Sequence, residues 1–245
     1  MKLKVLVIIP TYNEVENISD IINAVLEQGD QFEILIVDDN SPDGTVGVVS
    51  EKIQKYPSRV HLLQRPGKQG LGTAYIEGFK YGIKNDYDYL YEMDADFSHD
   101  PKDLPRLLNA CLQNGADLAI GSRYVEGGGL QDWPWIRRVL SKGASRYVKL
   151  ITSMPVQDST AGFKCYKSEV LKTINLGKIK CKGYAFQIEM KYATFLNGFK
   201  IVEVPIIFKD REKGTSKMSG RIIFEALRGV ITMKINSLKG YYKFV

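Results

Sequence analysis

Histidine and cysteine, which often act as bases, nucleophiles or metal ligands, are scarce in this sequence. The chain of 245 residues contains two histidines, His61 and His99, and three cysteines. The cysteines, Cys111, Cys165 and Cys181, are widely spaced and match no zinc or redox motif. These shortages argue against a catalytic-triad hydrolase, a zinc site and a disulfide framework, and they favour reduced thiols in the cytosol.

Long apolar runs are also missing. No segment reaches the roughly 18 uninterrupted apolar residues that a membrane-spanning helix requires. The apolar run at the N-terminus is short and continues into a polar turn, so it predicts a first strand and not a signal peptide. The sequence has no internal repeat and no low-complexity linker. We therefore expect one main domain that is soluble or membrane-associated.

Charge is unevenly distributed along the chain. The net charge is +6, and residues 209–245 contain nine Lys or Arg against three Asp or Glu. The preceding residues carry 25 basic and 25 acidic side chains, so the excess lies entirely in the tail. A neutral body with a basic end indicates an anionic partner for that end.

Short apolar runs alternate with segments of helical period through the first half. The predicted strands are KVLVIIP, FEILIVDD, RVHLLQR, DYLYEMDAD and ADLAIGS, and the predicted helices span 15–28, 45–56, 70–84 and 101–114. The second half is less regular, with helices expected over 136–151 and 184–196 and strands at GFKCY and KIVEVPIIF. Apolar strands separated by helices predict an α/β fold with a mostly parallel central sheet.

Three of these strands end in polar clusters, PTYNE, DDNSPDGT and DADFSHD. Ligands of such sheets bind beyond the carboxyl ends of the strands, so we expect the clusters to form one site. Asp94 and Asp96 have i and i+2 spacing, which places two carboxylates on one face of an extended segment. Oxygen ligands of this kind suit Mg²⁺ or Mn²⁺.

Capping is the structural alternative at each cluster. Asp100 precedes Pro101 and is expected to cap a helix, which leaves Asp94 and Asp96 unexplained. The segment 40–44 is expected to form a turn before a helix at Thr45, after the acidic pair at 38–39. A carboxylate at that strand end can equally accept from a ribose or a base.

The glycines of QRPGKQGLGTAYIEGF fit neither common phosphate-binding fingerprint, and a tight turn with close packing is slightly favoured over anion binding there. His61 is expected to be structural. His99 lies beside the acidic cluster, where a loop hydrogen bond is favoured over a role as ligand or second-shell donor.

Several cations also follow strand ends or open helices: Arg123, Arg137, Arg138, Lys164, Arg211 and Lys217. Each one alone is typical of a solvated surface. Together, opposite an acidic pair, they are what a diphosphate and a second phosphate require.

The order of these segments resembles glycosyltransferase family 2, and within it the dolichyl-phosphate (polyprenyl-phosphate) mannose synthases. The matching blocks run from about residue 5 to 220 and include VIIPTYNEVENI, VDDNSPDGT, GLGTAYIEGF, MDADFSHDP, IGSRYVEGGG, RRVLSKGAS, DSTAGFKCY, GYAFQIEM and VEVPIIFKDREKGTSKMS. The resemblance implies a GT-A fold, a nucleotide-diphosphate sugar donor, a divalent metal and inversion at the anomeric carbon.

The same resemblance implies roles for individual residues. The nucleoside pocket would be lined by Pro10, Tyr12, Glu14, Val37 and Asp39. Asp94, Ala95 and Asp96 would be the D-x-D motif that binds metal and diphosphate, followed by Ser98 where related enzymes often have Gln. The donor diphosphate and the acceptor phosphate would be held by Arg123, Arg137, Arg211 and Lys217.

The expected reaction is transfer of mannose from GDP-mannose to a polyprenyl or dolichyl phosphate. A glucosyl or aminosugar transferase using a UDP-sugar is the alternative within the family, and a non-enzymatic nucleic-acid binder is a distant one. The latter lacks any RNA-binding or helix-turn-helix signature, so no nucleic-acid partner is expected.

The expected domain limits are 1–215 for the catalytic domain and 216–245 for a C-terminal amphipathic basic helix. Longer relatives continue into transmembrane helices, whereas this chain stops short of them. The tail is therefore expected either to lie on a membrane surface, at the cytoplasmic face, or to pack on the domain, on a second copy or on a membrane partner.

Overall fold

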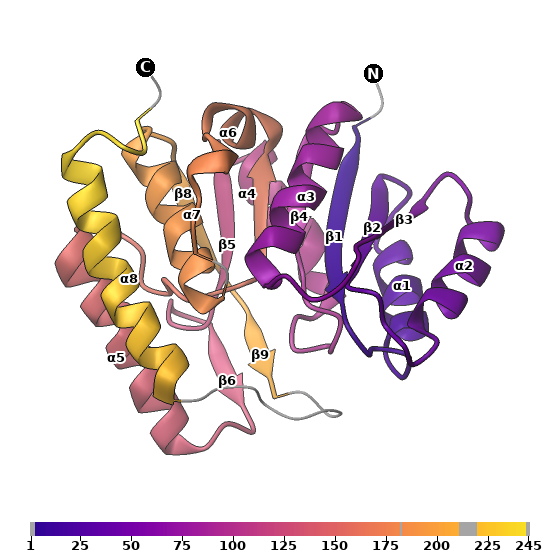
Figure 1. Ribbon diagram of the computed structural model, residues 1–245, viewed down its shortest axis with the longest axis horizontal. Coiled ribbons are helices and arrows are strands. Elements are labelled where there is room, and N and C mark those ends of the chain that lie inside the picture. The colour runs from indigo at the N-terminus through magenta and orange to yellow at the C-terminus, as the bar shows by residue number, and fades with distance from the viewer. Residues whose placement is uncertain (1–2, 182, 211–219, 244–245) are drawn as a thin grey trace.

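The computed structural model describes residues 3–181, 183–210 and 220–243 and shows a central sheet between two layers of helices (Figure 1). The seven-stranded sheet has the order β3-β2-β1-β4-β7-β5-β8. Its strands are β1 Val5–Thr11, β2 Phe32–Asp38, β3 Val60–Gln64, β4 Tyr89–Glu92, β5 Leu118–Ser122, β7 Lys164–Lys167 and β8 Ile201–Pro205. A small second sheet pairs β6, Gly129–Gln131, with β9, Ile207–Lys209.

Except for the short helix α6, which was not predicted, the helices agree with the predicted ones to within a few residues at most ends. They are α1 Ile18–Leu26, α2 Thr45–Lys55, α3 Leu71–Lys84, α4 Leu104–Leu112, α5 Trp135–Thr152, α6 Ser168–Thr173, α7 Tyr184–Leu196 and α8 Gly220–Leu238, with 3-10 turns at Pro101–Asp103 and Leu176–Lys178. None of the helices in the described ranges is long and apolar enough to cross a lipid bilayer.

Alternate residues of the central strands enter two separate cores, because successive side chains point to opposite faces of a sheet. Leu6 and Ile8 pack in one core with residues of α3, α6, α7 and α8. Val5 and Val7 pack in the other core with residues of α1, α2 and α4. This burial on both faces explains why the strands read as continuous apolar runs.

Two details of the sheet differ from the prediction. β7 runs antiparallel between β4 and β5, so the sheet is not parallel in its middle. The apolar run predicted as one strand is split at Ile206 into β8 and β9, which belong to different sheets. Pro205 ends β8, and proline supplies no backbone N–H to continue the ladder.

The C-terminal helix packs on the rest of the fold. α8 lies beside α7 and α5 (Figure 1). Val230 and Met233 are each 1% exposed and belong to the core shared with α3 and α7. Beyond the helix, the hydroxyl of Tyr242 donates to Oε1 of Glu189 at 2.7 Å. These contacts attach the tail of the chain to α7 at Val230, Met233 and Tyr242.

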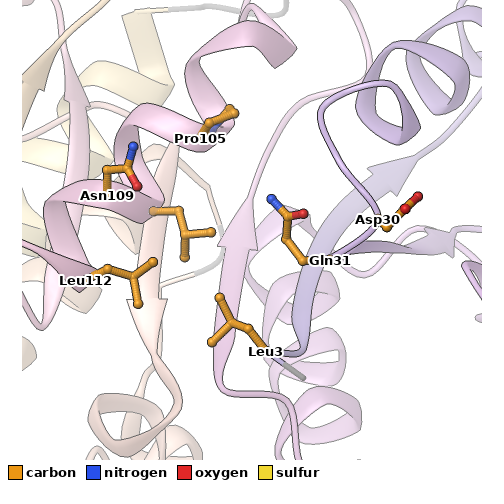
Figure 2. A pocket seen from close by; sticks show the side chains of 7 residues that line it. Leu3, Asp30, Gln31, Pro105, Asn109 and Leu112 are labelled. Atoms are coloured by element: carbon orange, nitrogen blue, oxygen red, sulfur yellow. The ribbon is translucent and has the colours of Figure 1, made fainter. Parts of the chain in front are cut away.

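A cleft of about 400 Å³ lies at the amino ends of β1 and β2, and it is shown in Figure 2. Its lining residues are Leu3, Asp30, Gln31, Pro105, Leu108, Asn109 and Leu112. None of the predicted site residues belongs to it. The polar clusters lie at the opposite edge of the sheet, where ligands of such folds bind.

Candidate active site

The acidic loop begins where β4 leaves the sheet. The N–H of Met93 still donates to the carbonyl of Ile8 in β1, at 3.2 Å. Asp94 and Asp96 follow, and the side chain of Asp94 is 40% exposed. The hydroxyl of Tyr75 in α3 donates to Oδ1 of Asp94 at 3.3 Å. The loop therefore presents carboxylates at the carboxyl edge of the sheet, as predicted.

Backbone turns and a cap shape the remainder of this loop. The N–H of Ser98 donates to Oδ1 of Asp96 at 3.1 Å, and Phe97 has a φ of 59°. Asp100 accepts from the N–H of Lys102 at 3.0 Å and caps the 3-10 turn that opens with Pro101. The prediction that Asp100 is a cap is confirmed.

His99 is buried behind the acidic loop and is 2% exposed. The N–H of Asp94 donates to Nδ1 of His99 at 3.2 Å, so this nitrogen carries a lone pair and the proton resides on Nε2. Burial lowers the pKa of His99 to about 4, which keeps the ring neutral. Nδ1 also lies 4.0 Å from Oδ2 of Asp94, but a neutral ring makes no ion pair there. The prediction of a loop hydrogen bond is confirmed.

The aspartates at the end of β2 and in the turn that follows have different surroundings. Asp38 is fully buried and accepts from the hydroxyls of Thr11 and Ser41 at 2.7 and 2.6 Å. These bonds connect the end of β1 to the loop after β2. Asp43 accepts from the N–H of Thr45 at 3.0 Å at the start of α2, and the predicted turn is confirmed.

Asp39 forms a buried ion pair with Arg65, a residue that sequence reasoning missed. Nε of Arg65 lies 2.6 Å from Oδ1 of Asp39, and the arginine side chain is 1% exposed. Nη1 of Arg65 also donates to the hydroxyl of Thr73 in α3 at 2.8 Å. The position of Arg65 just after β3, at the same edge as Asp39, was the available signal.

The end of β1 completes this part of the edge. Pro10 in β1 is paired with Val37 in β2. Nζ of Lys68 lies 3.8 Å from the centre of the Tyr12 ring, a cation–π contact. Glu14 accepts from the side-chain amide of Asn17 at 3.1 Å. The predicted nucleoside-binding residues therefore lie at or just after two adjacent strand ends, and Lys68 contacts one of them.

The glycine-rich segment after that loop packs closely, as predicted. A Cβ on Gly72 would lie 2.7 Å from the ring of Phe186 and 2.8 Å from the carbonyl oxygen of Cys181. Glycine at this position allows α3 to approach α7.

Arg123 follows β5 and is paired with Asp158, which is fully buried. Nε of Arg123 donates to Oδ2 at 2.7 Å, and Nη2 donates to Oδ1 at 2.6 Å and to the hydroxyl of Thr160 at 2.8 Å. Burial by itself would raise the pKa of Asp158, but the charge and hydrogen bonds of Arg123 outweigh it and hold the pKa below its usual value. The guanidinium carbon of Arg123 lies 5.5 Å from the ring centres of Trp133 and Phe208.

Arg137 on α5 lies at the same end of the molecule. Its Nη1 is 2.9 and 3.0 Å from the two carboxylate oxygens of Asp210, and its guanidinium carbon is 3.7 Å from the centre of the Trp133 ring. Arg211 and Lys217, which follow Asp210 in the chain, lie outside the described residues.

Two of the other cations considered from sequence have structural partners. Lys164 is fully buried, with its Nζ 2.8 Å from Oε1 of Glu92, so the reading of this residue as a phosphate ligand is wrong. Burial lowers the pKa of Lys164, and Glu92 opposes that change. Nε of Arg138 donates to the carbonyl of Trp133 at 3.0 Å.

The acidic loop is compatible with a hard divalent cation. Among the described residues, no group of three or more His, Cys, Asp or Glu side chains could enclose a metal ion. Two loop carboxylates, Asp94 and Asp96, fit Mg²⁺ or Mn²⁺, because these ions are often held by one or two carboxylates with substrate phosphates and water.

The sequence matches the model of glycosyl transferase family 2 over residues 6–174. It is 50% identical to a polyprenol monophosphomannose synthase of Mycolicibacterium smegmatis, over 91% of this chain and 84% of that protein. It is 46% identical to an undecaprenyl-phosphate mannosyltransferase of Micrococcus luteus, over 93% of both chains. A dolichol-phosphate mannosyltransferase of Pyrococcus furiosus is 40% identical, over 93% of this chain and 63% of that protein.

The fold is also similar to solved structures. The glucosyl-3-phosphoglycerate synthase of Mycobacterium tuberculosis in complex with uridine diphosphate has a TM-score of 0.67 at 16% identity, and covers 96% of this chain and 79% of its own. The same enzyme with Mn²⁺, UDP-glucose and glycerol 3-phosphate has a TM-score of 0.65 with the same coverage. These matches identify the fold as GT-A.

Proposed function

The chain belongs to glycosyl transferase family 2 and is a glycosyltransferase, and we propose that it transfers mannose from GDP-mannose to a polyprenyl phosphate with inversion at the anomeric carbon. The observation that carries the proposal is the gathering of two kinds of group at one edge of the sheet. Tyr12 and Asp39 follow β1 and β2, where we place the nucleoside, and Asp94 and Asp96 follow β4 at the same edge, where we place the diphosphate. The names of three relatives, each at least 40% identical, support mannose and a polyprenyl phosphate as the substrates.

The donor contacts follow from this arrangement. Pro10, Tyr12, Glu14, Val37 and Asp39 line the nucleoside pocket, where the ring of Tyr12 offers a stacking surface and Asp39 offers an acceptor. Arg65 belongs with this group, because its ion pair holds the carboxylate of Asp39 in place.

The phosphate contacts involve the acidic loop and the arginines. Asp94 and Asp96 would hold Mg²⁺ or Mn²⁺, which would supply positive charge for the departing nucleoside diphosphate. Ala95 and Ser98 contribute the backbone of the same loop. Arg123 and Arg137 supply positive charge for the donor diphosphate and the acceptor phosphate.

A phosphate acceptor explains why the site needs no strong general base. The second pKa of a phosphate monoester is about 6, so the attacking oxygen is already anionic near neutral pH. The requirement is instead to reduce repulsion between two phosphate-bearing substrates. Arginines and a divalent cation suit that task, and the scarcity of histidine is no obstacle.

Arg211 and Lys217 are proposed as further phosphate ligands. Lys217→Ala is expected to reduce turnover more than it reduces nucleotide binding measured without acceptor. An equal loss of both would assign Lys217 to the donor pocket alone.

The membrane surface is the proposed location of the enzyme, at the cytoplasmic face. Two neighbouring helices expose large apolar side chains, and Trp135 and Leu238 are 72% and 77% exposed. The others on these two helices are Ile136, Val139, Leu140 and Leu150 on α5 and Ile231 and Ile235 on α8. Basic residues accompany them, including Arg138, Lys142, Arg146 and Lys149 on α5. This combination suits an anionic lipid surface.

Substrate identity is tested with radiolabelled sugar donors and a polyprenyl phosphate in detergent. We expect transfer from GDP-mannose and little or none from UDP-glucose or UDP-GlcNAc. Preferential transfer from a UDP-sugar would refute the mannose assignment and favour a glucosyl or aminosugar transferase. Absence of transfer from every donor would contradict the proposed acceptor.

Membrane association is tested by flotation with vesicles that contain anionic lipid. Deletion of α8 is a poor test of membrane binding, because it would remove the core residues Val230 and Met233 and so disturb the fold. We therefore compare the full chain with a variant carrying Ile231→Lys, Ile235→Lys and Leu238→Lys, and with Leu112→Lys on the opposite edge as the matched control. The triple variant should float less than the control. Equal flotation of the three proteins would exclude α8 as a contact with lipid.

A further inference from the structure

His99, one of the two histidines in the chain, lies between two parts of the candidate site. It lies in the acidic loop, and it also lines a small cavity of about 10 Å³ together with Arg123 and Phe208. A cavity of that size has room for about one water molecule. The ring is thus packed between the acidic loop and the residues around Arg123.

Aromatic rings fix the orientation of His99. The ring of Phe163 is stacked on it, with centroids 5.0 Å apart and planes at 14°. Phe208 in β9 meets it edge-on at 5.5 Å and 76°. Such contacts restrict rotation of the imidazole, and burial of the ring removes competition from bulk water.

The fixed ring offers an acceptor to the backbone of the acidic loop. β4 ends at Glu92, so Asp94 lies beyond the strand ladder. The N–H of Asp94 donates to Nδ1 of His99 at 3.2 Å. This bond fixes the backbone from which the Asp94 carboxylate projects, and Asp96 is two residues away on the same loop.

We propose that His99 is a positioning residue, which holds the backbone of Asp94 so that the carboxylates of Asp94 and Asp96 can bind a divalent cation together with a nucleoside diphosphate. The inference rests on the proposed function only for the metal and the nucleotide, and it is independent of the sugar and the acceptor. Outer partners that orient the ligands of a metal typically affect its affinity by about 10- to 100-fold.

Two substitutions separate the hydrogen bond from the packing of the ring. His99→Phe keeps a planar ring between Phe163 and Phe208 but has no acceptor. His99→Asn loses the ring but places a side-chain oxygen near the position of Nδ1. If the hydrogen bond determines Mn²⁺ affinity, His99→Asn should bind Mn²⁺ more tightly than His99→Phe. If packing of the ring determines it, the order should be reversed.

The experiment measures binding of Mn²⁺ to the full chain in the presence of GDP, by electron paramagnetic resonance of the free ion. Thermal unfolding without metal reports on the fold of each variant. We expect His99→Phe to weaken Mn²⁺ binding by about 10- to 100-fold, and His99→Asn to recover most of that loss. If His99→Phe does not fold, His99→Leu, which is smaller and also lacks an acceptor, replaces it in the comparison.

The inference is overturned if the variant without an acceptor binds Mn²⁺ as well as the wild type does, or if the Asn variant is the weaker one. It is also overturned if the wild type binds no Mn²⁺ with GDP. A wild type that binds Mn²⁺ and GDP but transfers no mannose would refute the proposed substrate and leave the role of His99 intact.

Discussion

The guanidinium of Arg123 is held edge to edge by the buried carboxylate of Asp158, with Nε 2.7 Å from Oδ2 and Nη2 2.6 Å from Oδ1. The plane of the guanidinium is thereby fixed, and its side chain is only 7% exposed. An arginine held in this way can present its charge to a phosphate without first being ordered. The conformational entropy of the Arg123 side chain is lost on folding, when Asp158 becomes fully buried, and not on substrate binding.

Removal of one partner of this pair should be strongly destabilising. Asp158→Asn leaves a buried guanidinium without its counter-ion, and such changes typically cost about 3–5 kcal/mol. Urea unfolding at pH 7 measures the loss. Thr160→Val is the matched control, because it removes only the hydroxyl that accepts from the same arginine at 2.8 Å and donates to Asp158 at 3.4 Å, and it should cost about 1 kcal/mol. Equal losses in the two variants would contradict the importance of the ion pair.

The pH dependence of this difference has a definite sign. The pKa of Asp158 is lower in the folded than in the unfolded chain, so the ionised group contributes its full stability above the unfolded value of about 3.9. The contribution is lost as the pH falls through the folded value. The gap between wild type and Asp158→Asn should therefore stay constant from pH 8 to 5. A gap that closes within that range would refute the assignment.

Asp96→Asn should nearly abolish sugar transfer while the protein stays folded, because the amide keeps the shape but loses the charge that a divalent cation needs. Transfer assays and thermal unfolding are measured on the same preparation. Asp100→Asn is the control, since Asp100 caps a turn and its substitution should leave transfer intact. Full activity of Asp96→Asn, or of wild type in excess chelator, would contradict the metal assignment.

Arg65→Met should weaken GDP binding at least about tenfold, which corresponds to about 1.4 kcal/mol. The substitution leaves Asp39, which is 8% exposed, without its cation and free to turn away from the pocket. Calorimetric titration with GDP measures the effect. Glu77→Gln is a suitable control, because Glu77 lies farther from the same arginine, at 3.6 Å, and its side chain is 38% exposed. An unchanged affinity in Arg65→Met would separate Arg65 from the nucleoside pocket.

The thiol of Cys181 should be unreactive in the folded protein. Burial, followed by the nearby Glu189, raises its pKa to about 12, so only about one molecule in 10⁴ carries a thiolate at pH 8. Alkylation by iodoacetamide should be about 10³-fold slower than for a free cysteine, and unfolding in urea should remove the difference. Mass spectrometry of timed samples measures the rate at each cysteine. Rapid labelling of native Cys181 would contradict the raised pKa.

Most helices and strands could be predicted from the sequence, because buried runs and helical periods are local features. Strand direction is not local, and the antiparallel course of β7 depends on which neighbours it meets in space. The split of the last predicted strand at Ile206 has the same origin. Its residues are apolar throughout, and only the fold decides which sheet each part joins.

The acidic half of the site was easier to predict than the basic half. Asp94 and Asp96 stand out because two carboxylates directly after a buried strand are energetically unfavourable unless a positive group compensates them. Cations give no such signal, since lysine and arginine are common on surfaces. The sequence predicts Lys164 among the phosphate-binding cations, although Glu92 neutralises it in the core, and it does not point to Arg65, although this residue holds Asp39. Both errors concern pairs that are far apart in sequence.

The position of β7 also affects how a nascent chain can fold. β4 and β5 leave the ribosome before β7, yet in the sheet they are separated by it, since Glu92 faces Lys164 and Ala119 faces Cys165. Until residues 164–167 emerge, both strands have an edge without its final neighbour, and such edges can pair with other chains. The first four strands can form a sheet early, but its middle closes only when β7 arrives and brings the ammonium of Lys164 to Glu92.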